Sequence, residues 1–346
     1  MNIHRTLITL AALVFAAHIV AAPPPAAPQT GIAAALAFET GDFMKSTAHK
    51  GGAGIGSSMS PSGAFAANVA WESSKSGKWF IEEQRFAANA IGAGLALGDD
   101  NLIERGLKMI EWGFAHMEPD GSFKCDDSYH SASFFIEAAA YSLLLLENSA
   151  AREKWKPRIE AMKPSLQKAA RWMAKPAVSA PVWNGVQKMF AHRRFLCAAA
   201  LGESGVLLHD NDLIMKSKAL IRDGIHIQLP NGVNPEKGGY DSQYQSLGLI
   251  FAVRYFSIVA DAAQQTEMRR CVDRAFAWLV TRIGPNGTVS AQGNTRTGGQ
   301  ETGRGGAVKG VDFKFVSRAL ASWAAITRDA KLQDIAQKVS AADPKP

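Results

Sequence analysis

The sequence predicts an all-α protein, and more specifically an α/α toroid, closed or incomplete, of about five to six helical hairpins. Two observations predict it. Segments with one apolar face alternate with segments that are apolar nearly all round, and turns containing Pro and Gly recur at a regular spacing. No stretch alternates polar and apolar residues in the manner of a half-buried strand. An open solenoid is the alternative architecture.

The recurring turns read PSGAF, PDGSF, PNGVN and PNGTV, and they begin at Pro61, Pro119, Pro230 and Pro285. Their separations are 58, 111 and 55 residues, so the middle separation is about twice the other two. A further turn is therefore expected near residue 175, where KPAVSAPVW contains Pro176. A constant period of this size is typical of a repeat of helical hairpins.

The segments on the two sides of each turn differ in kind. The segment before a turn is charged and amphipathic, as in DNLIERGLKMIEWGFAHM, whereas the segment after it is apolar on most sides, as in SLGLIFAVRYFSIV. The first pattern predicts an outer helix with one wet face, and the second predicts a buried inner helix. The turns from outer to inner helices should then open at one end of the ring, where loops on a rigid scaffold carry function.

Residues 1–22 have the pattern of a secretory signal, because His4 and Arg5 precede an apolar run and then small residues. Removing this segment removes Arg5 and lowers the formal net charge from +7 to +6 (7 − 1). We therefore expect a periplasmic or secreted protein. A basic excess suits an acidic partner, and acidic polysaccharide is one such partner.

The rest of the chain divides into three parts. Residues 23–60 are rich in Pro, Ala and Gly, residues 61–330 form the predicted toroid, and residues 331–346 are expected to be a C-terminal tail. No later stretch reaches the roughly 18 apolar residues of a membrane span. We expect a monomer with no membrane span and no nucleic-acid partner.

Cysteine and histidine spacing predicts no cofactor and no metal site. Cys125, Cys197 and Cys271 form no CxxC pair, and the last two fall on apolar faces that we expect in the core. No HExxH motif or histidine pair at helical spacing is present. The glycines of GGAGIGSS follow no predicted strand, so they do not indicate a nucleotide-binding loop.

Polar and aromatic residues gather after the turns. Tyr129 and Tyr240 each lie ten residues beyond the proline of their turn, so KCDDSYHSAS and KGGYDSQYQS occupy equivalent positions. WNGVQKMFAHRR follows Pro176 in the same way. One rim should therefore collect Asp126, Asp127, Tyr129, His130, Trp183, Asn184, His192, Tyr240, Asp241 and Tyr244. Aromatic faces suit sugar rings, and amides and carboxylates suit sugar hydroxyls.

The segment 290–310, SAQGNTRTGGQETGRGGAVKG, contains seven glycines, two arginines and a lysine. It is most simply a mobile loop, and as a functional element it would be a basic lid over an anionic chain.

Several of these residues also have a structural explanation. Asp241 before SQYQSL is a good helix N-cap, Asn184 before GVQK could be another, and Tyr240 could pack against a neighbour. Tyr244 is harder to explain by packing, since Gly248 lies four residues on along the same face. His192 is followed by two arginines that are costly to bury, which favours a functional position.

An exported toroid with Asn, His, Arg and Tyr on one rim resembles the polysaccharide lyases of the alginate-lyase-like toroid class, over roughly residues 60–330. The resemblance lies in architecture and residue types. The family pattern has Asn followed directly by His, whereas here Gly185 follows Asn184 and the histidine comes at position 192. The resemblance implies β-elimination from a uronate: an amide or imidazole, helped by arginine, neutralises the carboxylate, and a tyrosine transfers the proton.

On this resemblance we assign two groups of residues. The expected catalytic residues are Tyr244, Tyr240, His192 and Asn184. The expected substrate-binding residues are Arg193, Arg194, Trp183, Tyr129, His130, Asp127 and Lys237. A tyrosine with an ordinary pKa of about 10 needs nearby cations and a helix N-terminus to act as a base, and Tyr244 begins a helix.

The sequence thus predicts an exported lyase that cleaves an acidic, uronic-acid-containing polysaccharide. Two other functions fit the same rim. A toroidal glycoside hydrolase acting on uronides would need two carboxylates, and Asp127 and Asp241 could supply them. A non-catalytic protein that binds exopolysaccharide would use the aromatic residues as stacking platforms.

Overall fold

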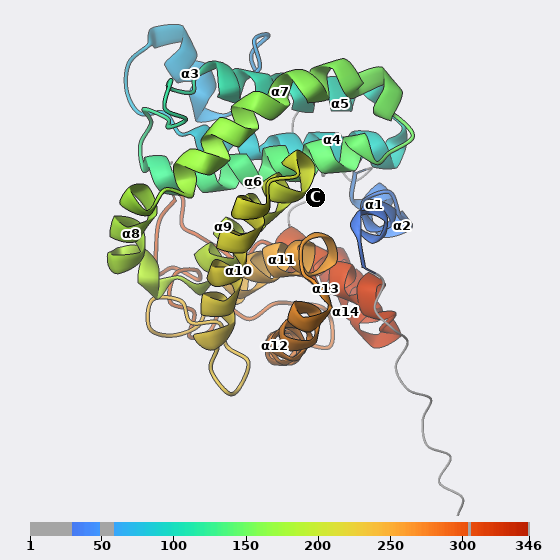
Figure 1. Ribbon diagram of the computed structural model, residues 1–346. Helices are drawn as coiled ribbons and strands as arrows, with labels where there is room; N and C mark the ends of the chain where they lie inside the picture. The colour runs from blue at the N-terminus through green and yellow to red at the C-terminus, as the bar shows by residue number, and fades with distance from the viewer. Residues whose placement is uncertain (1–29, 49–58, 304–305, 345–346) are drawn as a thin grey trace, which may run out of the picture.

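The structure is a computed structural model that describes residues 30–48, 59–303 and 306–344, and it confirms the all-α prediction (Figure 1). Isolated bridges occur among these residues, but no strand does. The signal expected at residues 1–22 lies outside the described residues. Within the described ranges no helix combines the length and the apolar character that a bilayer crossing requires.

Five consecutive helix pairs form the body of the described chain, and the apolar helix comes first in each pair. The pairs are α4 (Ala87–Leu97) with α5 (Asp100–Ala115), α6 (Ser128–Glu147) with α7 (Arg152–Met173), α9 (Ala191–Leu208) with α10 (Asn211–His226), α11 (Ser242–Ile258) with α12 (Ala262–Val280), and α13 (Phe313–Thr327) with α14 (Ala330–Ala341). The first helices pack on one another in sequence, from α4 through α6, α9 and α11 to α13.

Burial separates the two kinds of helix as the sequence pattern predicts. Every residue of α6 from Ser131 to Leu146 is buried, and α9 is buried almost throughout. In contrast, α10 buries only Leu213, Ser217, Ile221 and Gly224, which lie on one face. The first helix of each pair is therefore an inner helix and the second an outer helix.

Short connections lead from each inner helix to its outer partner, and four of them place an aspartate at the N-cap. Asp99, Asp210, Asp261 and Asp329 accept hydrogen bonds from backbone N–H groups in the first turns of α5, α10, α12 and α14. An aspartate cap stabilises a helix by about 1 kcal/mol, because it satisfies N–H groups that have no partner within the helix.

The Pro-Gly turns at Gly121, Gly232 and Gly287 lead from outer to inner helices, and the glycines of all four turns share one contact. Gly63, Gly121, Gly232 and Gly287 all have positive φ, between 85° and 109°. A Cβ on any of them would overlap a backbone carbonyl of an outer helix further along the chain, at Lys108, Lys168, Arg274 and Lys338 respectively. The turn glycine is thus required both by its dihedral angle and by the close approach.

Two of these turns are each held by hydrogen bonds from a glutamine side chain, with the same pattern of partners. Gln84 donates to the carbonyl oxygens of Gly63 and Met109 at 2.7 and 3.0 Å. Gln245 donates to the corresponding oxygens of Gly232 and Ala275 at 3.0 and 3.3 Å. Each amide oxygen also accepts the backbone N–H two residues after the turn glycine. The repeat read from the turns therefore extends to side-chain contacts.

Residue 176 departs from this pattern. Pro176 is the first residue of α8 (Pro176–Asn184), which is followed by the 3-10 helix η3 (Val186–Met189). The segment contains no glycine before Gly185, so it lacks the residue that lets the other turns seat on an outer helix. The expected turn is a helix with proline at its start.

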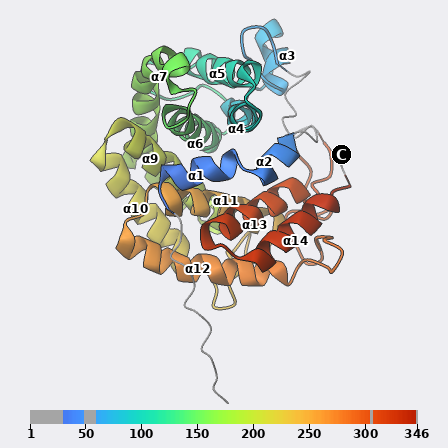
Figure 2. The same cartoon turned by 90° about the vertical axis from the view of Figure 1, so that its right-hand side faces the viewer.

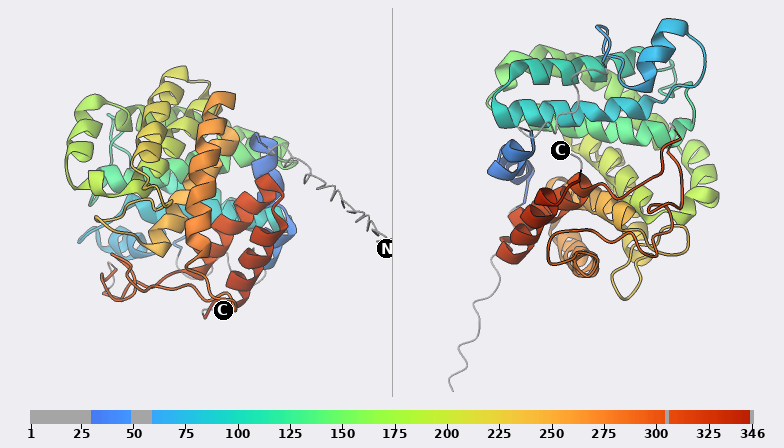
Figure 3. Two further views of the ribbon diagram at one scale, coloured as in Figure 1. Left: turned by 90° about the horizontal axis from the view of Figure 1, so that it is seen from below. Right: turned by 180° about the vertical axis from the view of Figure 1, so that it is seen from behind.

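Both terminal segments carry more structure than the sequence predicts. Residues expected to be a tail after 330 form α14, which buries Leu332, Ala336 and Val339 against α13. The N-terminal segment contains α1 (Ile32–Glu39) and α2 (Asp42–Thr47), and α3 (Ala67–Ser74) and the 3-10 helix η2 (Ile81–Phe86) precede α4. Figures 2 and 3 show α1 between the α4–α5 pair and the α13–α14 pair, and it contacts α4, α6, α11 and α13.

We predict that Gly232→Ala lowers the free energy of unfolding much more than Gly238→Ala. Both glycines have positive φ, at 91° and 79°, so each alanine costs about 1–2 kcal/mol in strain. Only at Gly232 does the added Cβ meet the Arg274 carbonyl, which adds about 1–3 kcal/mol. Urea unfolding of the two variants measures the difference. Equal losses would show that the turn does not depend on the close contact.

Candidate active site

One cavity of about 610 Å³ lies where the inner helices begin. The first turns of α4, α6, α9, α11 and α13 all contribute side chains to it, among them Asn89, His130, His192, Tyr244 and Phe315. This is the convergence on one rim that the alignment of the turns predicts. The cavity has the size and the mixed polar and apolar lining that are common in small-molecule sites.

Tyr244 lies in the wall of this cavity, in the first turn of α11. The guanidinium of Arg296 lies 3.8 Å from the centre of the tyrosine ring, and Nζ of Lys309 lies 3.4 Å from its hydroxyl. The His192 ring is 4.8 Å away, centre to centre. Gly248 permits this approach, since a Cβ there would lie 3.1 Å from the Cα of His192. Two cations and an imidazole therefore surround one phenol.

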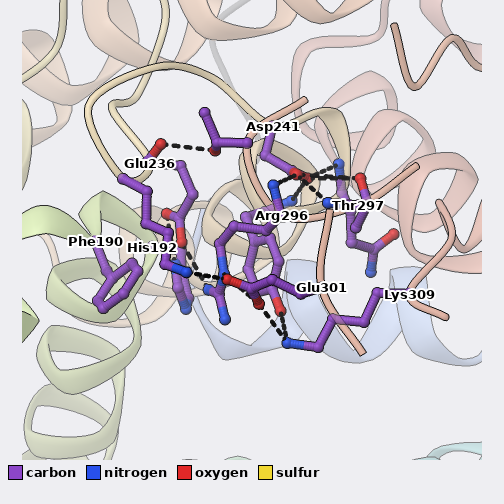
Figure 4. Close-up of polar contacts among 12 residues, drawn as sticks. Phe190, His192, Glu236, Asp241, Arg296, Thr297, Glu301 and Lys309 are labelled. Carbon is purple, nitrogen blue, oxygen red and sulfur yellow. Dashed lines mark hydrogen bonds and ion pairs between the residues drawn. The ribbon is translucent and has the colours of Figure 1, made fainter. Parts of the chain in front are cut away.

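His192 and Glu236 form a buried pair (Figure 4). The Nδ1 atom of His192 lies 2.8 Å from Oε2 of Glu236, and both side chains are 2% exposed. Burial lowers the pKa of His192, and Arg193 and Arg296 act in the same direction, although Glu236 opposes them. The imidazole is therefore neutral near pH 7. Because the carboxylate only accepts, Nδ1 carries the hydrogen and Nε2 remains an acceptor.

Arg296 connects this pair to a second carboxylate. Its Nη1 donates to Oε1 of Glu236 at 2.8 Å, and its Nε donates to Oε2 of Glu301 at 3.2 Å. Burial would lower the pKa of Arg296, but Tyr244 and the two carboxylates raise it above its ordinary value. The guanidinium is thus held charged against the tyrosine ring.

Glu301 forms ion pairs with the other cations near Tyr244. Its carboxylate accepts from Lys309 at 2.7 Å and also from Lys237 and Arg296. Its partial burial would raise the pKa, but the hydrogen bonds from Lys237 and Lys309 and the charge of Arg296 lower it to about 2. Lys237 therefore acts on the site through Glu301, and it does not line the cavity itself.

Asp241 joins the start of α11 to the glycine-rich segment (Figure 4). Its Oδ1 accepts the N–H groups of Gln243 and Tyr244 at 3.0 and 3.2 Å, which is the N-cap that the sequence suggests. Its Oδ2 accepts the N–H groups of Arg296 and Thr297 at 2.9 and 2.8 Å. One carboxylate, 1% exposed, thus sets the positions of both Tyr244 and Arg296.

These contacts correct the interpretation of residues 290–310 as a mobile loop. Asn294, Arg296 and Thr297 are buried, and the Asn294 side chain accepts the Ser242 N–H at 3.1 Å. The Thr295 N–H donates to the Tyr240 carbonyl at 2.9 Å. The first half of the segment is a fixed wall of the site. Its glycines permit tight turns, at Gly293, Gly298 and Gly299, where φ is positive.

Three further predicted residues, Asp127, His130 and Arg193, line the cavity. Nε2 of His130 lies 4.0 Å from Glu82. Arg193 is 9% exposed, and no described residue pairs with its Nε. Burial lowers the pKa of Arg193, while the charge of Asp127 opposes that shift. Because Arg193 is a guanidinium that lines the cavity, it is suited to an anionic ligand.

Tyr129 and Tyr240 occupy equivalent positions, as predicted, but both pack on a tryptophan outside the cavity. Tyr129 lies 6.2 Å from Trp172, and Tyr240 lies 5.3 Å from Trp278, ring centre to ring centre. The carbonyls of Lys168 and Arg274 on the outer helices contact turn glycines, and Trp172 and Trp278 each lie four residues after one of them. The Tyr240 hydroxyl donates to the Gln292 carbonyl at 3.1 Å. The two tyrosines therefore recur at equivalent positions because each packs on a tryptophan of an outer helix.

The other predicted residues also lie outside the cavity lining. Asn184 is the exposed last residue of α8 and caps no following helix. Trp183 lies against Tyr129, and the Arg194 guanidinium lies 5.4 Å from the Trp183 ring. Arg194 forms an ion pair with Asp223 of α10.

Sequence reasoning missed four charged residues at the centre of the site: Glu236, Arg296, Glu301 and Lys309. Glu236 lies in the NPEKGGY loop, and the other three lie in the glycine-rich segment. A signal was available, because charged residues in a segment so rich in glycine are not explained by the solvent-exposed face of a helix. Within the part of the chain that the structure describes, no cluster of three or more His, Cys, Asp or Glu residues could hold a metal ion.

We predict that Asp241→Asn destabilises the protein by about 1–3 kcal/mol, because the amide presents an N–H group where two buried N–H donors need an acceptor. Asp329→Asn is the matched control. Asp329 caps α14 at the surface, and asparagine caps a helix about as well as aspartate, so the change should stay within about 0.5 kcal/mol. Urea unfolding measures the stability of both variants. Equal losses would show that Asp241 contributes no more than an ordinary helix cap.

We also predict that His192→Gln flattens the dependence of stability on pH. The ordinary pKa of 6.5 is lowered in the folded protein, so the unfolded chain takes up a proton first as the pH falls. Wild-type stability should therefore fall below pH 6.5, by up to about 1.4 kcal/mol per pH unit from this group. Urea unfolding at about pH 7 and pH 5 compares the two proteins, and parallel losses would contradict a neutral His192.

The arrangement of Tyr244, His192, Arg296 and Lys309 is what any functional interpretation of this chain has to explain. Comparison with families of known proteins, with curated proteins and with solved structures found no match for this chain. Since a fold alone does not specify an activity, the function has to be argued from the chemistry of the site.

Proposed function

We propose that the protein is an exported polysaccharide lyase that cleaves a uronic-acid-containing polysaccharide by β-elimination. The five helix pairs would form an incomplete α/α toroid with the active site at one end. The observation that carries the proposal is the surroundings of Tyr244, a cavity-lining phenol with Arg296 over its ring and Lys309 at its hydroxyl.

In the proposed reaction the Tyr244 oxygen takes the proton from C5 of the uronate. A tyrosine that acts as a base is a phenolate, and the charges of Arg296 and Lys309 compensate that anion. Glu236 and Glu301 hold the two cations in place, so they need not reorganise when the proton moves. The bond from C4 to the linking oxygen then breaks, a double bond forms between C4 and C5, and the leaving oxygen takes up a proton.

The C5 proton becomes acidic only when the neighbouring carboxylate is neutralised. Arg193 is suited to this purpose, because it is a cation that lines the cavity. The neutral His192 is held at Nδ1 by Glu236, its ring lies beside that of Tyr244, and its Nε2 is left as an acceptor. His192 is therefore suited to exchanging a proton with the tyrosine or the leaving oxygen, and less suited to neutralising a carboxylate.

The position of Asp241 counts against the hydrolase alternative. A glycosidase needs two carboxylates that face the substrate, and Asp241 is 1% exposed with both oxygens accepting backbone N–H groups. Asp127 lines the cavity, but it would need a different partner. The binding alternative also loses support, because its predicted stacking residues Tyr129, Trp183 and Tyr240 pack outside the cavity.

We predict that Tyr244→Phe slows elimination by about 100-fold or more while stability changes by only about 0.5–1.5 kcal/mol. The ring and its packing on Arg296 remain, and only the hydroxyl is lost. Tyr240→Phe is the control, since its hydroxyl meets the Gln292 carbonyl away from the cavity. Turnover is followed on a panel of uronic-acid polysaccharides by the ultraviolet absorbance of the conjugated double bond.

Two outcomes would count against the proposal. If Tyr244→Phe retains most of its turnover, the proton passes through another group, and His192 is the next candidate. If the wild-type protein shortens the polysaccharides without new absorbance, the reaction is hydrolysis.

A further inference from the structure

The cavity is deep, and its two ends differ in chemistry. Along α11 its lining runs from Gln243 to Arg254, a separation of eleven residues (254 − 243) or about 16 Å of helix. Tyr244 and His192 lie at the shallow end, beside Lys309 and Thr302 of the glycine-rich segment. Arg254 lies at the deep end, so the long axis of the cavity follows the inner helices.

An ion-pair network forms the floor. Arg254 forms an ion pair with Glu137 of α6, and its guanidinium lies 3.8 Å from the Tyr141 ring centre. Arg318 of α13 lies 2.5 Å from Glu39 of α1, and the Tyr141 hydroxyl donates to the same carboxylate at 2.8 Å. Three inner helices and α1 therefore meet at this floor.

Helix α1 closes the cavity on the far side of these arginines. The gap beyond Arg254 and Arg318 measures about 30 Å³, and Ala34, Ala35 and Phe38 of α1 line it. That space suffices for about one water molecule. Glu39 is 1% exposed, so the face of α1 that meets the arginines is buried at its C-terminal end. A polymer cannot pass along the cavity from end to end.

The walls between the two ends suit a sugar ring. Leu247, Ile250 and Phe251 of α11 face the cavity, and so do Phe134 of α6 and Phe315 of α13. At the floor, each arginine donates to one carboxylate and has five N–H groups in all, so donors remain for hydroxyl or carboxylate oxygens.

We propose that this blind cavity binds the end of a uronic-acid chain, with its terminal sugar against Arg254 and Arg318 and a linkage near that end at Tyr244. The protein then acts from a chain end and releases short products. This proposal rests on the proposed lyase function for its chemistry, but the binding mode has its own test.

The first test follows product size with the wild-type protein. Action from a chain end makes absorbance rise while the viscosity of the polymer solution falls slowly, and size-exclusion chromatography shows short products from the start. Early collapse of viscosity with fragments of intermediate length would overturn the proposal, because it requires a groove that accepts the middle of a chain.

The second test measures binding without turnover. Tyr244→Phe is titrated by calorimetry with a long uronan and with short saturated oligosaccharides of the same uronan at equal uronate mass. Binding to chain ends predicts that the concentration of ligand sites scales with the number of chain ends. At equal uronate mass, the short oligosaccharides therefore offer many more ligand sites than the long uronan. Site numbers that scale with uronate mass would overturn the proposal.

A substitution that fills the cavity provides the third test. Ala138 of α6 lines the cavity and is 2% exposed, so Ala138→Leu should weaken oligosaccharide binding by about tenfold or more. Ala161→Leu on the exposed face of α7 is the matched control and should bind normally. Unchanged binding by a folded Ala138→Leu protein would overturn the proposal, and if this variant does not fold, the two preceding tests decide.

The two proposals fail in different ways. Binding that follows chain ends without any new absorbance would leave the blind site in place and remove the elimination chemistry. New absorbance with fragments of intermediate length would keep the lyase and remove the chain-end site.

Discussion

The site depends on one buried carboxylate, that of Asp241. Its two oxygens take up four backbone N–H groups, two from the start of α11 and two from the glycine-rich segment. A helix start and a distant loop each carry N–H groups without partners, and a charged acceptor satisfies both sets more strongly than a neutral one. Because Tyr244 follows on one side and Arg296 lies on the other, the stacking of guanidinium on phenol results from this shared acceptor.

Two charged networks lie at the two ends of the cavity, and they are stabilised differently. Near Tyr244, Glu301 accepts hydrogen bonds from three cations, and Glu236 accepts from Arg296 and from the neutral His192, so each buried charge is matched by several hydrogen bonds. At the floor, Arg254 serves Glu137, while Glu203 of α9 has no hydrogen-bonding partner among the described residues. Burial, with the nearby charge of Glu137, raises the pKa of Glu203 well above its ordinary value, so this carboxyl is kept neutral.

The sequence was most informative where a local rule determines the structure. Helix type followed from apolar periodicity, and the convergence of inner-helix N-termini followed from the spacing of the turns. The equivalence of Tyr129 and Tyr240 was also correct, but it reflects packing on Trp172 and Trp278. Periodicity finds positions that every repeat needs, whereas a catalytic group such as Tyr244 belongs to one repeat only. Glu236 and Arg296 could not be paired from sequence, because sixty residues separate them and contacts such as those of Asp241 bring their segments together only in the folded protein.

The seating of the turn glycines has a consequence for the order in which the chain acquires its structure. Each turn packs on an outer helix that lies further toward the C-terminus, between 42 residues (274 − 232) and 51 residues (338 − 287) along the chain. A turn therefore stays unsupported until that later helix has been synthesised and has docked. The last of these turns, at Gly287, waits for Lys338 in α14. Vectorial synthesis would thus leave each turn unsupported until the outer helix of the pair that follows it has been made. The turn that precedes the glycine-rich wall of the site would become fixed only once α14 has docked.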